Sequence, residues 1–198
     1  MPNMLHLQTT SNTELITYLT EIEGKLPSNE FLICITGTDE DPIVGDKFNI
    51  LATCFDDEVY GPRQLSFSDG MRIFSFIKYK VAPAAQKLKN CTLVISCKDG
   101  LTRSGSIAEW VAQYVDKHLL DAAYYEEKNL LIEPSQLTLY KMYLVQMLQE
   151  HLIRPEESLP SVAVKLLETS TSSLTKKNCE DYLNALLINE TKLLTRDK

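Results

Sequence analysis

The chain has 198 residues, of which 44% are hydrophobic and 24% are charged, an ordinary composition for a globular protein. This length suffices for one domain with a substantial core, alone or with an appendage. The formal net charge of -7 argues against binding to nucleic acid or to an anionic membrane through bulk electrostatics.

The amino-terminal segment MPNMLHLQTTSN has no basic stretch followed by an apolar one, so we expect no secretory signal. No apolar run reaches the roughly 18 residues of a membrane-spanning helix, and we expect no integral membrane segment. A cytoplasmic location follows, with delivery into another cell left open. The cysteines show no spacing typical of metal ligands or of a disulfide framework, and we expect all but Cys97 to be small core residues: Cys34, Cys54, Cys91 and Cys179.

The first part of the chain predicts one helix and two strands. Apolar residues at helical spacing predict a helix that begins at Asn12 or Thr13 and ends at Gly24. The apolar runs EFLICITG at 30–37 and FNILATCFDD at 48–57 predict two strands, and the second ends at an acidic pair.

The middle of the chain predicts a helix followed by a third strand. The helix covers 70–88 behind a cap at Ser68 or Asp69, and it bends or breaks at Pro83 because proline removes a helical hydrogen bond. The run CTLVISC at 91–97 is the third strand.

Two further helices follow, over 103–120 and 134–153. Strands that alternate with helices indicate a mainly parallel sheet covered on both faces, which is a three-layer α/β/α fold. Beyond Pro155 the composition changes, and a Ser/Thr-rich segment separates two short helical patterns. We predict a domain over 1–155 and a helical extension over 156–198, whose role the sequence leaves open.

The turn after the third strand brings a cysteine and an arginine to the carboxyl end of the sheet, where open parallel sheets bind ligands. The backbone amides of 98–103 and the positive end of the next helix can hold an anion there, and Gly100 allows the tight turn. The partial positive charge of these amides and of the helix end favours the thiolate of Cys97, which is the nucleophilic form. Arg103 offers donors for two phosphate oxygens, and Ser104 can stabilise the sulfur when it leaves.

The segment SCKDGLTRSGS resembles the phosphate-binding loop of the cysteine-dependent protein tyrosine and dual-specificity phosphatases, whose pattern is His-Cys-x5-Arg-Ser/Thr. The resemblance covers about residues 30–150, in the order acid loop, helix, strand, phosphate-binding loop, helix. It implies a dual-specificity-phosphatase-like fold and a phosphocysteine intermediate on Cys97, formed without metal or other cofactor. It also implies that the phosphate is bound by Lys98, Asp99, Gly100, Leu101, Thr102 and Arg103.

The segment FDDEVYGP at 55–62 resembles the general-acid loop of compact members of this superfamily. In those members the second acidic residue protonates the leaving oxygen, and this position is Asp57; Asp56 is the alternative. Two adjacent carboxylates raise each other's pKa, which suits an acid that works near about pH 6.

Three residues depart from the family pattern. Ser96 replaces the histidine before the nucleophile, and Ser135 stands where the family has an asparagine that braces the loop. Asp99 adds a carboxylate that opposes an incoming phosphate unless it points away or pairs with Lys98. A slow enzyme, an unusual substrate and an inactive phosphate binder all stay open.

We expect a phosphatase that acts on phosphotyrosine, phosphoserine or phosphothreonine of proteins. One alternative is hydrolysis of phosphoinositides or inositol phosphates, in which Lys98 would contact a second phosphate. Another is a pseudophosphatase that captures phosphorylated partners; the oligomeric state stays open. The densest basic cluster precedes the third strand and should lie at the opposite end of the sheet, away from substrate: Lys78, Lys80, Lys87 and Lys89.

Overall fold

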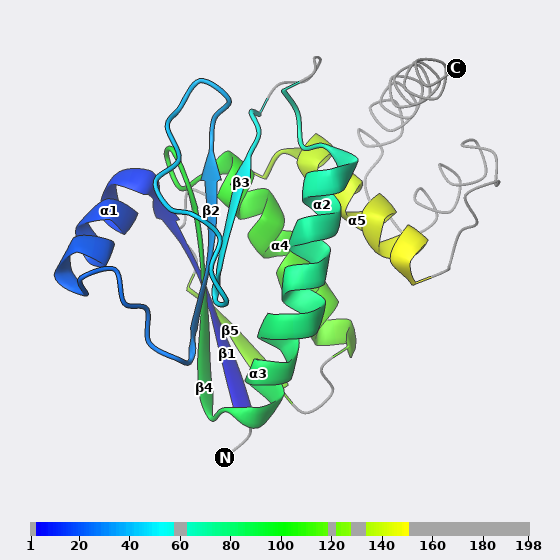
Figure 1. Cartoon of the computed structure of the whole chain (residues 1–198). Coiled ribbons are helices and arrows are strands. Elements are labelled where there is room, and N and C mark those ends of the chain that lie inside the picture. Colours follow the sequence, from blue (N-terminus) through cyan, green and yellow to red (C-terminus); the bar gives the residue numbers. More distant parts are fainter. Residues whose placement is uncertain (1–2, 58–62, 119–121, 128–133, 151–198) are drawn as a thin grey trace. The chain divides into compact units, whose positions relative to one another are not determined.

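The computed structural model describes residues 3–57, 63–118, 122–127 and 134–150 (Figure 1). The described strands are β1 (Asn3–Ser11), β2 (Glu30–Thr36), β3 (Ile50–Cys54), β4 (Asn90–Cys97) and β5 (Ala122–Glu127). The described helices are α1 (Asn12–Glu21), α2 (Phe67–Phe76), the π-helix η1 (Ile77–Val81), α3 (Ala82–Lys87), α4 (Thr102–His118) and α5 (Gln136–Gln149). The chain divides into two compact units, Met1–Met142 and Tyr143–Lys198. The boundary predicted at residue 155 lies outside the described residues.

All neighbouring strands in the first unit pair in parallel, in the order β3-β2-β4-β1-β5. Helix α1 covers one face of this sheet, and α2, η1, α3 and α4 cover the other (Figure 1). The predicted α/β fold with a parallel sheet and helices on both faces is therefore confirmed.

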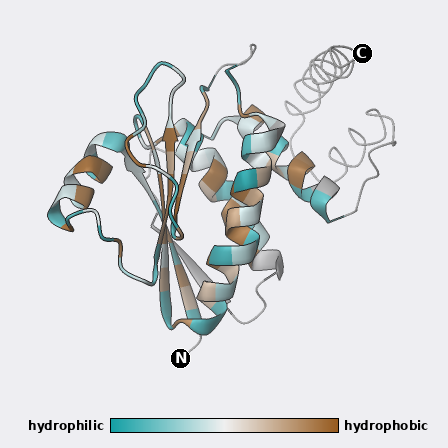
Figure 2. Cartoon of the chain, in the orientation of Figure 1, coloured by the Kyte–Doolittle hydropathy of each residue, from teal (hydrophilic) through white to brown (hydrophobic). Residues whose placement is uncertain are grey.

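Apolar side chains fill both faces of the sheet, whose strands are largely hydrophobic in Figure 2. Under α1 the core consists of Leu15, Leu32, Cys34, Ile50 and Val94. On the other face Trp110 of α4 is fully buried, with its ring 6.1 Å from that of Phe74 and 5.4 Å from that of Tyr114. The apolar side of the helix after the third strand thus packs on the sheet, as its spacing indicates.

Two strands were not predicted from the sequence. β1 lies between β4 and β5, where its buried Leu5, Leu7 and Thr9 alternate with more exposed residues. An alternation with a period of two is typical of a strand, and it was present in the sequence of residues 3–11. β5 follows α4 closely, and its segment AAYYEE does not alternate between apolar and polar residues.

Both helix caps differ from those predicted. Ser11, rather than Asn12 or Thr13, caps α1, and its side chain and that of Glu14 bond each other's backbone amides. Ser66 caps α2 by accepting a hydrogen bond of 3.0 Å from the Asp69 amide. The position of a cap depends on where the preceding strand or loop leaves the backbone extended, which residue type alone does not determine.

The long helix of the middle segment is neither ended nor broken at Pro83. A π-helical turn, η1, separates α2 from α3, and Pro83 lies at the start of α3. A proline cannot donate the usual helical hydrogen bond, and a wider turn just before it accommodates the ring without ending the helix.

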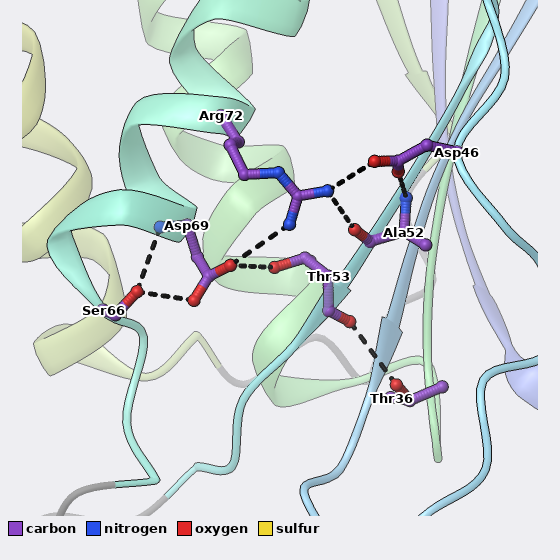
Figure 3. Close-up of polar contacts among 7 residues, drawn as sticks. All are labelled: Thr36, Asp46, Ala52, Thr53, Ser66, Asp69 and Arg72. Atoms are coloured by element: carbon purple, nitrogen blue, oxygen red, sulfur yellow. Dashed lines mark hydrogen bonds and ion pairs between the residues drawn. The ribbon is translucent and has the colours of Figure 1, made fainter.

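At the β3 edge of the sheet, side chains bond the backbone of Ala52 (Figure 3). Ala52 of the edge strand β3 donates its amide to Asp46 Oδ1 at 2.8 Å, and its carbonyl accepts from Arg72 Nη2 at 2.9 Å. Arg72 also pairs with Asp46 Oδ2 at 2.7 Å, and it lies 3.4 Å from Asp69 Oδ1. These contacts satisfy backbone groups that would otherwise be open to pairing with another chain.

Cys54, at the end of this edge strand, is exposed, and its thiol donates to the Gly37 carbonyl at 3.2 Å. The expectation of a core residue was therefore wrong for Cys54, because an edge strand is covered on fewer sides than an inner one. Cys34 and Cys91 are buried as expected, and Cys179 lies outside the described residues.

Candidate functional site

The loop from Cys97 to Arg103 joins the end of β4 to the first turn of α4. Strand β4 is buried along most of its length, and Cys97 is its last residue. The helix begins at Thr102, so its unpaired amides and the positive end of its dipole lie at the loop. We call residues 97–103 the 97–103 loop.

Cys97 lies at the base of this loop, and only 2% of the residue is exposed. Its Sγ is 3.2 Å from Ser104 Oγ, and either atom can donate the hydrogen bond. Ser104 is fully buried in the first turn of α4. A hydroxyl in this position can donate to a sulfur anion, which is the role expected for Ser104 in the sequence.

Arg103 turns inward, and only 7% of the residue is exposed. Its Nη1 donates a hydrogen bond of 2.9 Å to the carbonyl of Phe55 and lies 3.9 Å from Asp56 Oδ1. Nε and Nη2 have no partner among the described residues. Two donors of the guanidinium are thus available to an anion at the loop.

Asp56 is held as a carboxylate by its neighbours. Thr38 donates its hydroxyl to Oδ2 and its amide to Oδ1, the latter at 3.3 Å. The hydrogen bond from the Thr38 hydroxyl is the main cause that lowers the pKa of Asp56; burial opposes it, and the Thr38 amide, Arg103 and Arg63 add to the lowering. The expectation that the acidic pair raises its own pKa is therefore wrong for Asp56. A carboxylate held in this way is a poor proton donor at neutral pH.

Asp57 is exposed, and no hydrogen bond or ion pair engages its side chain among the described residues. Its neighbours 58–62 in the predicted acid loop lie outside the described residues. Of the two carboxyl groups, only that of Asp57 has no hydrogen-bond or ion-pair partner among the described residues.

Gly100 is the residue on which the shape of the loop depends. Its φ is +71°, and a Cβ there would lie 2.8 Å from the Ser11 amide nitrogen and 2.8 Å from the Thr10 carbonyl carbon. The loop therefore packs directly on the end of β1, where Ser11 pairs in register with Cys97. Only glycine both adopts this positive φ readily and has no Cβ to clash with the backbone of β1.

The other residues expected to bind phosphate lie at the surface of the loop. Lys98 and Asp99 are exposed, whereas Leu101 and Thr102 are half-buried. No ion pair joins Asp99 to Lys98 in the described structure. The ion pair with Lys98 that would have neutralised Asp99 is thus absent from the described structure, and Asp99 adds an exposed negative charge to the loop.

Ser96 points to the opposite face of the sheet from Cys97, because neighbouring residues of a strand alternate. It is fully buried, and its hydroxyl has no hydrogen-bond partner in the described part of the chain. In the adjacent strand it pairs with Cys34, whose thiol pKa is raised, mainly by burial. Ser96 therefore does not orient the loop through a hydrogen bond.

Ser135 contacts the helix that follows the loop rather than the loop itself. Its carbonyl accepts from Ser106 Oγ at 3.2 Å, while the same hydroxyl lies 2.7 Å from the Thr102 carbonyl.

A buried lysine lies in α5. Lys141 donates to Gln64 Oε1 and to the Leu65 carbonyl, both at 2.8 Å. Burial lowers the pKa of Lys141 to about 8.

Sequence reasoning missed three contributors to the site: Gly37, Thr38 and the carbonyl of Phe55. All lie just beyond the ends of β2 and β3. A Cβ on Gly37 would lie 2.8 Å from Asp56 Oδ1, so any side chain there would displace the carboxylate from this position. The carboxyl ends of parallel strands meet at one edge, and this rule could have identified them once the strand order was known.

No family model, curated protein or solved structure matches the chain. Among the residues that the structure describes, no helix is both long and apolar enough to cross a membrane.

Proposed function

We propose that the protein is a cysteine-dependent phosphatase of the dual-specificity type, which hydrolyses phosphate monoesters of proteins. The observation that carries the proposal is the arrangement of Cys97, Ser104 and Arg103 around one helix amino terminus. The sulfur lies 3.2 Å from a hydroxyl, and an inward guanidinium has two free nitrogens. The resemblance of the 96–106 segment to the phosphate-binding loop of these enzymes supports the same function.

In the first step, Cys97 Sγ attacks phosphorus while the bond from phosphorus to the ester oxygen breaks. Asp57 gives its proton to the departing oxygen, which leaves as an alcohol or phenol. The amides of 98–103 and Arg103 hold the non-bridging oxygens as charge builds up on them. The product of this step is a phosphocysteine and an Asp57 carboxylate.

In the second step, water attacks the phosphocysteine and gives a proton to the Asp57 carboxylate. The bond from sulfur to phosphorus breaks, and inorganic phosphate forms. Ser104 donates its hydrogen bond to the sulfur, so that Cys97 leaves as a thiolate. The cycle restores the protonated Asp57 and consumes only water.

The test is single-turnover hydrolysis of an aryl phosphate by the wild-type protein and by Cys97→Ser, with acid quench to trap phosphoenzyme. We expect the wild type to form a phosphocysteine and to release phosphate, and Cys97→Ser to do neither. Equal rates for the two proteins would refute the proposal.

A second function is a phosphate-binding protein without turnover. It is favoured by the state of Asp56, which Thr38 and Arg103 hold as a carboxylate and which is therefore a poor proton donor for turnover. Tight binding of a phosphate ester by the wild type, with no phosphocysteine after acid quench, would support this function over catalysis.

A further inference from the structure

The site provides for a single phosphate group. Arg103 is more than nine-tenths buried and keeps Nε and Nη2 unpartnered among the described residues. Its third nitrogen is engaged by the carbonyl of Phe55. Together with the amides at the start of α4, these two donors match one oxyanion.

Carboxylates line the side of the site beside Arg103. Asp56 Oδ1 lies 3.9 Å from Arg103 Nη1. The carboxyl groups of Asp56 and Glu40 both pack on Gly37, where a Cβ would lie 2.8 Å from Asp56 Oδ1 and 3.2 Å from Glu40 Cδ. Asp39, the neighbour of Glu40, is exposed and pairs with Arg63 at 2.5 Å.

Carboxylates also lie on the side of the loop formed by β1. Gly100 packs on the backbone of Thr10 and Ser11, and both residues donate hydrogen bonds to Glu14 Oε2. These bonds, led by that from the Ser11 amide, lower the pKa of Glu14 and keep it ionised. Asp99 adds an exposed carboxylate on the loop itself.

Few cations balance these carboxylates. Arg63 is already paired with Asp39, which leaves the exposed Lys98 as the cation of the loop surface in the described structure. Lys78 and Lys80 belong to η1, where their ammonium groups lie over aromatic rings. η1 leads through α3 to the start of β4 at Asn90, which is the opposite end of that strand from the 97–103 loop.

A metal ion does not account for the carboxylates. Within the described residues, no three His, Cys, Asp or Glu side chains are grouped so as to hold one. The carboxylates without an ion-pair partner among the described residues, Glu40 and Asp99, can therefore attract cationic groups of the substrate.

We propose that the site selects phosphorylated peptide segments with lysine or arginine next to the phosphorylated residue, and that it rejects polyphosphorylated substrates such as phosphoinositides. The inference rests on the proposed function for the position of the phosphate. One phosphate is neutralised by Arg103 and the amides, while any further negative charge meets Glu40 or Asp99, which have no ion-pair partner among the described residues. Like charges brought together in this way oppose binding, and cationic flanks are attracted.

The test uses three phosphotyrosine peptides of equal length with Lys/Arg, Ser/Gly or Glu/Asp flanks, and a short-chain phosphatidylinositol bisphosphate. The measured quantity is kcat/KM from phosphate release, at low and at high salt. We expect the basic peptide to exceed the acidic one by roughly tenfold or more at low salt, and the ratio to fall towards one at high salt. The phosphoinositide should be the slowest substrate.

The double variant Glu40→Gln/Asp99→Asn should lower this basic-to-acidic ratio several-fold. The matched control is Glu21→Gln/Glu23→Gln, which removes the same charge from exposed residues at the far end of α1. The control should leave the ratio unchanged, because screened charges act over about one Debye length.

Binding separates this inference from the proposed function. The same labelled peptides are titrated into Cys97→Ser, which keeps the charges of the site but cannot form a phosphocysteine. The basic peptide should bind tightest whether or not the wild type turns over. If all peptides bind equally, or if the acidic peptide or the phosphoinositide is preferred, the inference is wrong. If wild type hydrolyses no aryl phosphate but the order of binding holds, the inference stands and catalysis fails.

Discussion

Arg103 Nη1 donates a hydrogen bond of 2.9 Å to the carbonyl oxygen of Phe55. Phe55 is fully buried just after β3, while Arg103 belongs to the first turn of α4. Two segments 48 residues apart in the chain are thus joined at the carboxyl edge of the sheet. The bond fixes the guanidinium with its other two nitrogens free, before any anion is bound.

Replacement of this arginine by lysine tests whether the fixed fork of donors matters. Lysine keeps the charge but cannot bond Phe55 and two phosphate oxygens together. We expect Arg103→Lys to lower kcat for an aryl phosphate by about 10²–10³, the usual loss for one organised donor. Arg72→Lys is the control, since the partners of Arg72 are Asp46, Asp69 and Ala52. Equal losses in the two variants would contradict a specific role for Arg103.

The two acidic residues after β3 should differ in their dependence on the leaving group. Asp57→Asn should slow phenyl phosphate, which needs a proton donor, by about 10² and dinitrophenyl phosphate far less. Asp56→Asn should slow both substrates alike, because it removes the ion pair and the bonds from Thr38 without removing the acid. The reverse pattern in steady-state rates would assign the acid to Asp56.

Gly100 should tolerate no side chain. The left-handed backbone alone costs alanine about 1–2 kcal/mol, and Gly100→Ala adds a clash with the backbone of Thr10 and Ser11. Gly24→Ala is a matched control, since Gly24 has a φ of +67° and nothing within 4 Å of its Cβ position. In urea unfolding, Gly100→Ala should therefore lose more stability than Gly24→Ala. Equal losses would mean that the loop does not pack on β1 as described.

Lys141 should make stability depend on pH. Burial lowers its pKa from 10.5 to about 8 in the folded state, so the unfolded chain binds more protons between these values. The free energy of unfolding contributed by Lys141 therefore rises as the pH rises from about 8 to 10.5.

The variant Lys141→Met removes this titration. Urea unfolding at pH 7 and pH 10.5 should show the wild type gaining about 3 kcal/mol relative to the variant, since the shift spans about 2.5 pKa units at about 1.4 kcal/mol each and is nearly complete over this range. Lys25→Met is the control, because the side chain of Lys25 is 83% exposed. A difference between wild type and Lys141→Met that does not change with pH would show that Lys141 titrates normally.

The sequence by itself determined the local parts of the site. The apolar run before Cys97, the glycine at 100 and the amphipathic segment after Arg103 identify a strand, a tight turn and a helix, because each depends on neighbouring residues. The alternation of such segments was also enough to predict a parallel sheet with helices on both faces.

Only the tertiary structure decided which strand ends meet. The order β3-β2-β4-β1-β5 brings Thr38, Phe55 and Arg103 together, and it packs Gly100 on Ser11. These neighbours also reversed the expectation of a raised pKa for Asp56: its pKa is lowered because Thr38 and Arg103 lie beside it. These contacts join residues distant in the chain, and the periodicity of a single segment carries no information about which other segment will lie next to it.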